Sequence, residues 1–136
     1  MNERTRCMVV DDEPDIRLLV RSMIEQEAHR FSMACDAENG ERAIELVDEC
    51  DPEVIILDEF MPDMTGLEAA EKIFMRRPGQ RFVLFSAYIG PELRRRAADL
   101  GIGVCLSKTD VDLLPEAVAI AAAAASPGLN AQCREW

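Results

Sequence analysis

The chain has 136 residues, which is the length of one domain. A domain of this size buries about two-thirds of its unfolded surface and needs no disulfide or metal ion to be stable. Its formal net charge of -11 excludes a general nucleic-acid or anionic-membrane surface, because the net field repels phosphate groups. The sequence has no basic-then-apolar leader and no apolar stretch long enough to cross a bilayer. We therefore expect a cytoplasmic protein that has no membrane segment and does not bind nucleic acid directly.

The cysteines give an expectation about redox state. They are odd in number and scattered, at Cys7, Cys35, Cys50, Cys105 and Cys133. No Cys-x-x-Cys pair and no Cys/His spacing typical of a metal site occurs among them. This usage favours reduced thiols, as in cytosolic proteins, and argues against a zinc site.

Short apolar runs alternate with longer amphipathic segments along the chain. The runs predict five strands, over residues 8–10, 31–35, 54–57, 82–85 and 104–106. Apolar residues recur at helical spacing between them, and the residues that suit helix starts are Pro14, Asn39-Gly40, Pro91 and Pro115. The last helix is expected over residues 111–125 and consists almost entirely of alanine and aliphatic residues beyond Glu116.

This alternation predicts a doubly wound α/β domain. Parallel strands need right-handed crossovers, and the crossover helices cover both faces of the sheet. We expect one five-stranded parallel domain over residues 1–125. Residues 126–136 follow a Ser-Pro-Gly break and read as a carboxyl-terminal tail or the start of a linker.

Carboxylates follow two of the predicted strands. Asp11 and Asp12 close the first strand, and Asp58 closes the third. Ligands of open parallel sheets bind beyond the carboxyl ends of the strands, where the strand order reverses. Clustered carboxylates repel one another and call for a cation, and oxygen ligands of this kind suit Mg²⁺. Asp58 is then a candidate acceptor for a phosphoryl group that Mg²⁺ would screen.

Two further strand ends carry hydrogen-bond donors. Ser86 follows the fourth strand, and Lys108 lies just past the fifth. A hydroxyl and an ammonium at the same edge of the sheet can bind phosphoryl oxygens through bonds that exist only when the group is present. This pattern is typical of a protein that a phosphoryl group switches between two states.

The joint pattern resembles the receiver domain of two-component response regulators over nearly the whole chain. The pattern consists of the acidic pair, Asp-x-x-Met-Pro-x-Met-x-Gly from Asp58 to Gly66, then the serine and the lysine. The resemblance implies the flavodoxin-like strand order 2-1-3-4-5. It also implies that Asp58 is the phosphoacceptor and that Ser86 and Lys108 contact the phosphoryl group.

The resemblance further implies the ligands of Mg²⁺. Asp12 would bind the ion directly and Asp11 largely through water, with Asp58 and the backbone carbonyl of Phe60 completing the protein ligands. A phosphohistidine of a sensor histidine kinase, or a phosphotransfer protein, would donate to Asp58. The domain would catalyse only its own phosphorylation and dephosphorylation.

The same resemblance places the output surface on the fourth helix, fifth strand and fifth helix, where a homodimer can form. The alternative function is a Mg²⁺-dependent phosphohydrolase with an aspartyl-phosphate intermediate. That enzyme needs a second carboxylate two residues beyond the nucleophile, and Phe60 stands there. The sequence leaves open whether the chain is free-standing or part of a longer protein.

Two positions depart from the usual receiver pattern. Cys105 lies three residues before Lys108, where an aromatic residue is usual, so coupling by aromatic rotation is not expected. Thr109 follows Lys108 where many receivers have proline, which predicts a trans peptide bond between the two.

Overall fold

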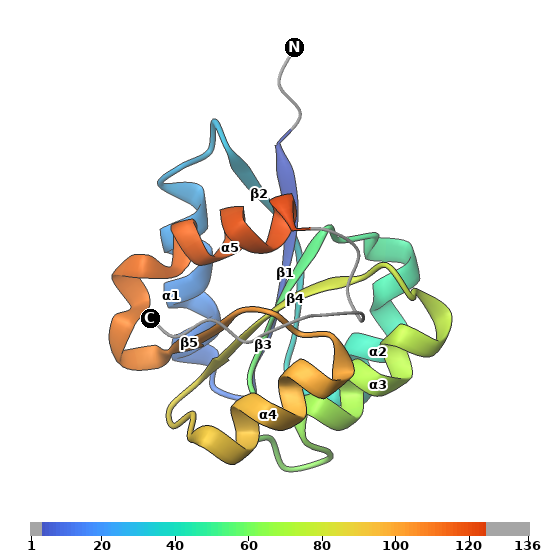
Figure 1. Ribbon diagram of the computed structural model, residues 1–136. Helices are drawn as coiled ribbons and strands as arrows, with labels where there is room; N and C mark the ends of the chain where they lie inside the picture. The colour runs from blue at the N-terminus through green and yellow to red at the C-terminus, as the bar shows by residue number, and fades with distance from the viewer. Residues whose placement is uncertain (1–3, 125–136) are drawn as a thin grey trace.

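The computed structural model describes residues 4–124. Within this range strands and helices alternate (Figure 1). The strands are β1 (Thr5–Val10), β2 (Phe31–Ala37), β3 (Val54–Leu57), β4 (Arg81–Ser86) and β5 (Cys105–Ser107). The helices are α1 (Pro14–Glu25), α2 (Gly40–Cys50), α3 (Gly66–Arg76), α4 (Pro91–Leu100), a 3-10 helix η1 (Lys108–Leu113) and α5 (Leu114–Ala123).

The five strands form one parallel sheet in the order β2-β1-β3-β4-β5. The predicted α/β fold and its strand order are therefore confirmed. The order reverses between β1 and β3, which pair in register up to Val10 and Leu57. Residues that follow these two strands consequently emerge side by side at the carboxyl edge of the sheet.

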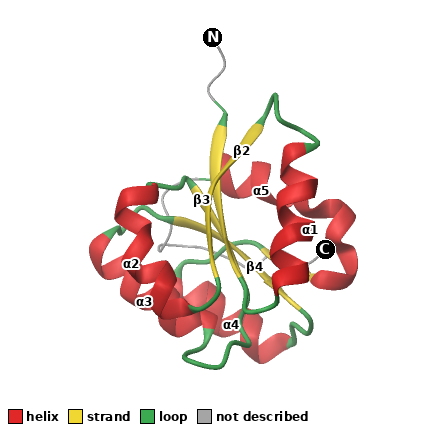
Figure 2. Ribbon diagram, turned by 180° about the vertical axis from the view of Figure 1, so that it is seen from behind, coloured by secondary structure: helices red, strands yellow, loops and turns green. Residues whose placement is uncertain are grey.

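Helices cover both faces of the sheet, as Figures 1 and 2 show. One buried cluster joins the sheet to α1 and α5 and includes Val20, Ile24, Ile56, Phe85 and Val118. The other joins the opposite face to α2, α3 and α4 and includes Val47, Ile55, Ile73, Leu84 and Leu93. Each of these larger side chains contributes about 1.5–3 kcal/mol when it leaves water, so the two clusters hold the sheet edge rigidly.

Local sequence signals set the helix starts. Pro14 and Pro91 are the first residues of α1 and α4, where a missing N–H costs nothing. Asn39 caps α2 through a bond from the N–H of Arg42, and Thr65 forms a reciprocal capping box with Glu68 at α3. The helix starts predicted at Pro14, Asn39-Gly40, Pro91 and Pro115 are confirmed, since Pro115 lies in the first turn of α5.

The segment after β5 differs from the sequence prediction. The expected helix over residues 111–125 instead begins as the 3-10 helix η1, and α5 starts only at Leu114. The non-helical φ and ψ of Asp110 place a kink within η1 before α5 begins. The predicted trans bond between Lys108 and Thr109 is confirmed. No helix within residues 4–124 is long and apolar enough to cross a membrane.

The expectation of reduced cysteines is wrong. Cys35 on β2 and Cys50 at the end of α2 form a disulfide, with their Cα atoms 6.3 Å apart, and Cys105 is also disulfide-bonded. Spacing along the chain carries no sign of the first pair, because it arises only when α2 folds back beside β2. Cys7 is a free, buried thiol. The predicted tail, residues 126–136, lies outside the described residues.

Candidate functional site

The two buried aspartates of the site lie on neighbouring strands. Asp11 follows β1 and is 1% exposed, and Asp58 follows β3 and is 3% exposed. The sheet fixes both backbones, since the N–H of Asp58 donates to Val10 O at 3.0 Å and that of Asp11 donates to Ala37 O at 3.1 Å. Two carboxylates are thus held at one edge of the sheet, where the fold positions them before any ligand arrives.

Lys108 reaches this pair from the end of β5. Its Nζ lies 2.8 Å from Asp11 Oδ2, 3.4 Å from Asp58 Oδ2 and 3.5 Å from Glu13 Oε1. Burial favours the neutral amine, but the hydrogen bond to Asp11 and the charge of Asp58 outweigh it and raise the pKa of Lys108. The side chain is therefore a firmly protonated cation between the carboxylates.

Ser86 and the backbone complete the surroundings of Asp58. The Ser86 hydroxyl, which is fully buried at the end of β4, donates to Asp58 Oδ1 at 2.9 Å. Burial and the nearby charge of Asp11 raise the pKa of Asp58, and Lys108, Ser86 and the N–H of Phe60 oppose that shift. Asp58 is thus a partly desolvated carboxylate with a donor near each oxygen.

Three consecutive carboxylates form an acidic cluster beside Asp58. Each of Asp11, Asp12 and Glu13 offers an oxygen, and these atoms lie within 4.8 Å of one another. Asp12 and Glu13 are exposed, whereas Asp11 is buried and accepts a hydrogen bond from the Glu13 N–H at 2.9 Å. A set of oxygen donors open to solvent on one side fits a hard, partly hydrated divalent cation.

The loop after Asp58 is tied to the start of α3 by Glu59. Its carbonyl accepts from the Gly66 N–H, and its buried carboxylate accepts from the Leu67 N–H, each at 2.9 Å. Burial raises the pKa of Glu59. Gly66 packs so closely that a Cβ there would lie 2.2 Å from the Asp58 carbonyl oxygen. These contacts fix the backbone that presents Asp58.

The structure brings together Asp11, Ser86, Lys108 and Asp58, and it places Asp12 at the open side. Phe60, the predicted carbonyl ligand, has a side chain that is 57% exposed, while its N–H faces the Asp58 carboxylate. Sequence reasoning missed the roles of Glu13 and Glu59 in the site. Glu13 directly follows the acidic pair in the sequence, and this position could have indicated that it lies in the site. Glu59 has no such sequence signal, because its burial depends on the packing of α3 against it.

Chemically, this arrangement can receive an electrophilic phosphoryl group. Asp58 is the only one of the clustered carboxylates with both a hydroxyl and an ammonium donor beside it among the described residues. Ser86 ends β4 and Lys108 directly follows β5, so the two donors approach a tetrahedral group on Asp58 from different parts of the sheet edge.

Comparison with known proteins agrees with this geometry. The family model for the response regulator receiver domain matches residues 7–119. Among curated relatives, the transcriptional regulatory protein DegU of Brevibacillus brevis is 31% identical over 132 residues, which is 90% of this chain and 54% of DegU. Chemotaxis protein CheY of Halobacterium salinarum is 31% identical over 103 residues, or 76% of this chain and 83% of CheY.

Solved structures give the same fold. The signal receiver domain of the putative response regulator NarL from Mycobacterium tuberculosis has a TM-score of 0.80 at 26% identity, covering 90% of this chain and all of that one. The isolated receiver domain of RcsB from Salmonella enterica serovar Typhimurium, solved with the phosphomimetic BeF3-, has a TM-score of 0.81 at 20% identity, covering 95% and 96%. The chain spans about half the length of DegU, so the similarity concerns the receiver portion of such proteins.

Proposed function

Because the chain belongs to the response regulator receiver domain family of two-component signalling, we propose that it is a phosphorylation switch with Asp58 as its phosphoacceptor. The placement of Asp58 supports this role, because its Oδ1 accepts a hydrogen bond from Ser86 at 2.9 Å and its Oδ2 lies 3.4 Å from Lys108 Nζ. A phosphoryl group on either oxygen would find both donors within reach.

The proposed phosphorylation of Asp58 would require a bound Mg²⁺ ion. Asp11, Asp12, Asp58 and the Phe60 carbonyl would hold it, and the acidic cluster supports this assignment because its oxygens already converge. When bound, the ion would neutralise charge on the phosphoryl oxygens. Ser86 and Lys108 would orient the group and stabilise the charge that remains on it. Asp58 needs no base, since a carboxylate is the attacking form.

The switch would act through contacts that exist only after phosphorylation. Lys108 now lies closer to Asp11 than to Asp58, and a dianionic group on Asp58 would compete for its ammonium. Since Lys108 begins η1 and Ser86 ends β4, their movement would reach α4, β5 and α5. We assign the output surface to these elements.

The donor would be a phosphohistidine of a sensor histidine kinase or of a phosphotransfer protein, and the domain would catalyse only its own modification and its reversal. A homodimer could use the α4-β5-α5 surface, where Ala119 is half-buried and Ala123 is exposed. Phe60 stands where a phosphohydrolase needs an acid, so no residue there supports the alternative hydrolase.

A phosphoryl mimic tests the proposed switch without a kinase. BeF3- and Mg²⁺ added together should raise the melting temperature and shift the amide signals of Ser86 and of the residues around Lys108. Either reagent alone should do less, and Asp58→Ala should abolish the joint effect. The same joint stabilisation in Asp58→Ala would contradict the assignment of Asp58 as phosphoacceptor.

A further inference from the structure

The disulfide between Cys35 and Cys50 joins the sheet to the end of α2. We propose that this pair is a reversible redox site, opened by dithiol reductants, that controls how firmly α2 holds the loop carrying Asp58. Its effect on phosphorylation rests on the proposed function of Asp58, whereas its effect on α2 does not.

Both cysteines of the bond are partly exposed. Cys35 and Cys50 are only partly buried and pack against the edge of the core cluster under α2 and α3. Cys7 offers a contrast on the neighbouring strand, because it is fully buried and burial raises its pKa to about 12. An accessible disulfide exchanges with thiols, while a buried, protonated thiol does not react.

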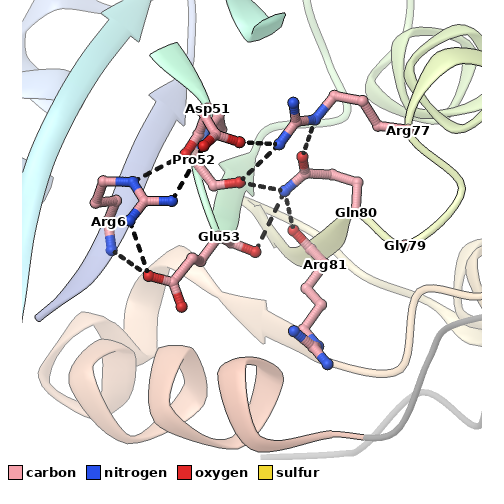
Figure 3. Close-up of a pocket in the computed structure, with 8 residues that line it drawn as sticks. All are labelled: Arg6, Asp51, Pro52, Glu53, Arg77, Gly79, Gln80 and Arg81. Carbon is pink, nitrogen blue, oxygen red and sulfur yellow. Dashed lines mark hydrogen bonds and ion pairs between the residues drawn. The ribbon is translucent and has the colours of Figure 1, made fainter. Parts of the chain in front are cut away.

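The end of α2 has a second attachment that survives reduction. Asp51 directly follows Cys50 and adopts the left-handed conformation, with φ 48°. Its carbonyl accepts from Arg6 Nε at 3.0 Å, and its carboxylate accepts from Arg77 at 2.8 Å (Figure 3). These arginines, from β1 and the end of α3, line a pocket of about 250 Å³ at the opposite edge from Asp58. Reduction should therefore loosen α2 without releasing it.

The other end of α2 contacts the phosphoacceptor loop. The N–H groups of Gly40 and Glu41 donate to the Asp63 carboxylate, at 3.3 and 2.9 Å. Asp63 lies between Asp58 and the start of α3. A Cβ on Gly40 would lie 2.6 Å from Met64 Cγ, so helix and loop are also in tight contact. α2 thus spans the distance from the disulfide to the loop that presents Asp58.

The dithiol alone supplies the electrons that reduce the disulfide. A thiolate of the dithiol attacks one sulfur of the disulfide, forms a mixed disulfide and releases the other cysteine as a thiolate, which takes up a proton. The second thiol of the reductant then displaces the remaining cysteine. Two electrons pass to Cys35 and Cys50, which become thiols, and the reductant becomes a cyclic disulfide. The reverse reaction restores the bond.

The test compares oxidised and dithiothreitol-reduced protein under native conditions. Alkylation and peptide mapping should find Cys35 and Cys50 modified only after reduction. The melting temperature should fall by about 10 °C, because opening the loop between residues 35 and 50 frees the unfolded chain, while the fold persists. Amide exchange in α2, including Gly40 and Glu41, should quicken at least fivefold, and the rate of Asp58 phosphorylation by acetyl phosphate should change at least twofold.

Matched variants assign the effect to this bond. Cys35→Ser and Cys50→Ser should each show the fast α2 exchange of reduced protein, and the dithiol should not quicken it further. Cys105→Ser should still respond, because the pair on β2 and α2 remains. Failure of the dithiol to open the bond in folded protein, or reduction that leaves α2 exchange unchanged, would overturn the proposal. An equal phosphorylation rate in oxidised and reduced protein would overturn the link to Asp58. If neither the oxidised nor the reduced protein is phosphorylated, the proposed function fails. The amide exchange of α2 would then still test whether the disulfide is a redox site.

Discussion

Lys108 Nζ lies 2.8 Å from Asp11 Oδ2, a closer contact than the 3.4 Å to the proposed phosphoacceptor. The ammonium is thus held by the neighbouring carboxylate before phosphorylation. Asp11 thereby serves two purposes, since it neutralises a buried cation and keeps that cation beside Asp58.

Removing this cation should destabilise the fold. Lys108→Met leaves the buried carboxylates of Asp11 and Asp58 without their partner, and a broken buried pair costs about 3 kcal/mol. Urea unfolding in the presence of a chelator measures the loss. Added Mg²⁺ should recover part of the stability, because it supplies the missing positive charge. An unfolding midpoint equal to that of the wild type would show that Lys108 does not neutralise the pair.

Asp58 should lower stability at neutral pH. Its folded pKa is raised, so the native state binds the proton more tightly than the unfolded chain, and this favourable contribution is lost as pH rises through the folded pKa. Asp58→Asn removes the charge and keeps an acceptor for Ser86. Without Mg²⁺, the variant should be more stable by about 1 kcal/mol at pH 7.

The pH dependence provides the control for Asp58→Asn. The difference between the two proteins should shrink as pH falls through the folded pKa of Asp58, where the wild-type carboxyl is also neutral. Unfolding curves collected from acid to neutral pH test this. A stabilisation that is constant over the whole range would have some other cause.

Mg²⁺ should stabilise the protein through the acidic cluster. At a concentration one hundred times the dissociation constant, a ligand that binds only the native state adds about 2.7 kcal/mol. Thermal unfolding across a Mg²⁺ titration measures this gain. Asp12→Ala should weaken it without harming the apoprotein, because Asp12 is exposed. Equal Mg²⁺ stabilisation of both proteins would remove Asp12 from the ligand set.

Gly66 should tolerate no side chain. Gly66→Ala places a methyl carbon 2.2 Å from the Asp58 carbonyl oxygen, and backbone must move to relieve the contact. We expect a loss of about 1–3 kcal/mol together with slower phosphorylation. Gly79→Ala is the matched control, since a Cβ there meets nothing within 4 Å and should change stability by less than about 0.5 kcal/mol. Similar behaviour of the two variants would argue against the proposed packing constraint.

The sequence predicts the sheet and the meeting of Asp11, Ser86 and Lys108 at Asp58, because each residue ends or directly follows a strand and parallel strands end at one edge. It does not predict contacts made when helices pack. The bond between Cys35 and Cys50 needs α2 to lie beside β2, and the burial of Glu59 needs α3 to offer it an N–H. The alanine-rich pattern alone does not show where α5 begins, but Pro115 marks that start, after the interruption of η1 at Asp110.

Phosphorylation of Asp58 is measured by the intact mass of the protein after incubation with acetyl phosphate. We expect the mass of one phosphoryl group to appear with Mg²⁺, to fail to appear with a chelator, and to be absent in Asp58→Ala. Fragmentation of the wild-type adduct should place the group on Asp58. A Mg²⁺-dependent adduct of equal yield in Asp58→Ala, or one that maps to Asp11 or Asp12, would show that Asp58 is not the phosphoacceptor.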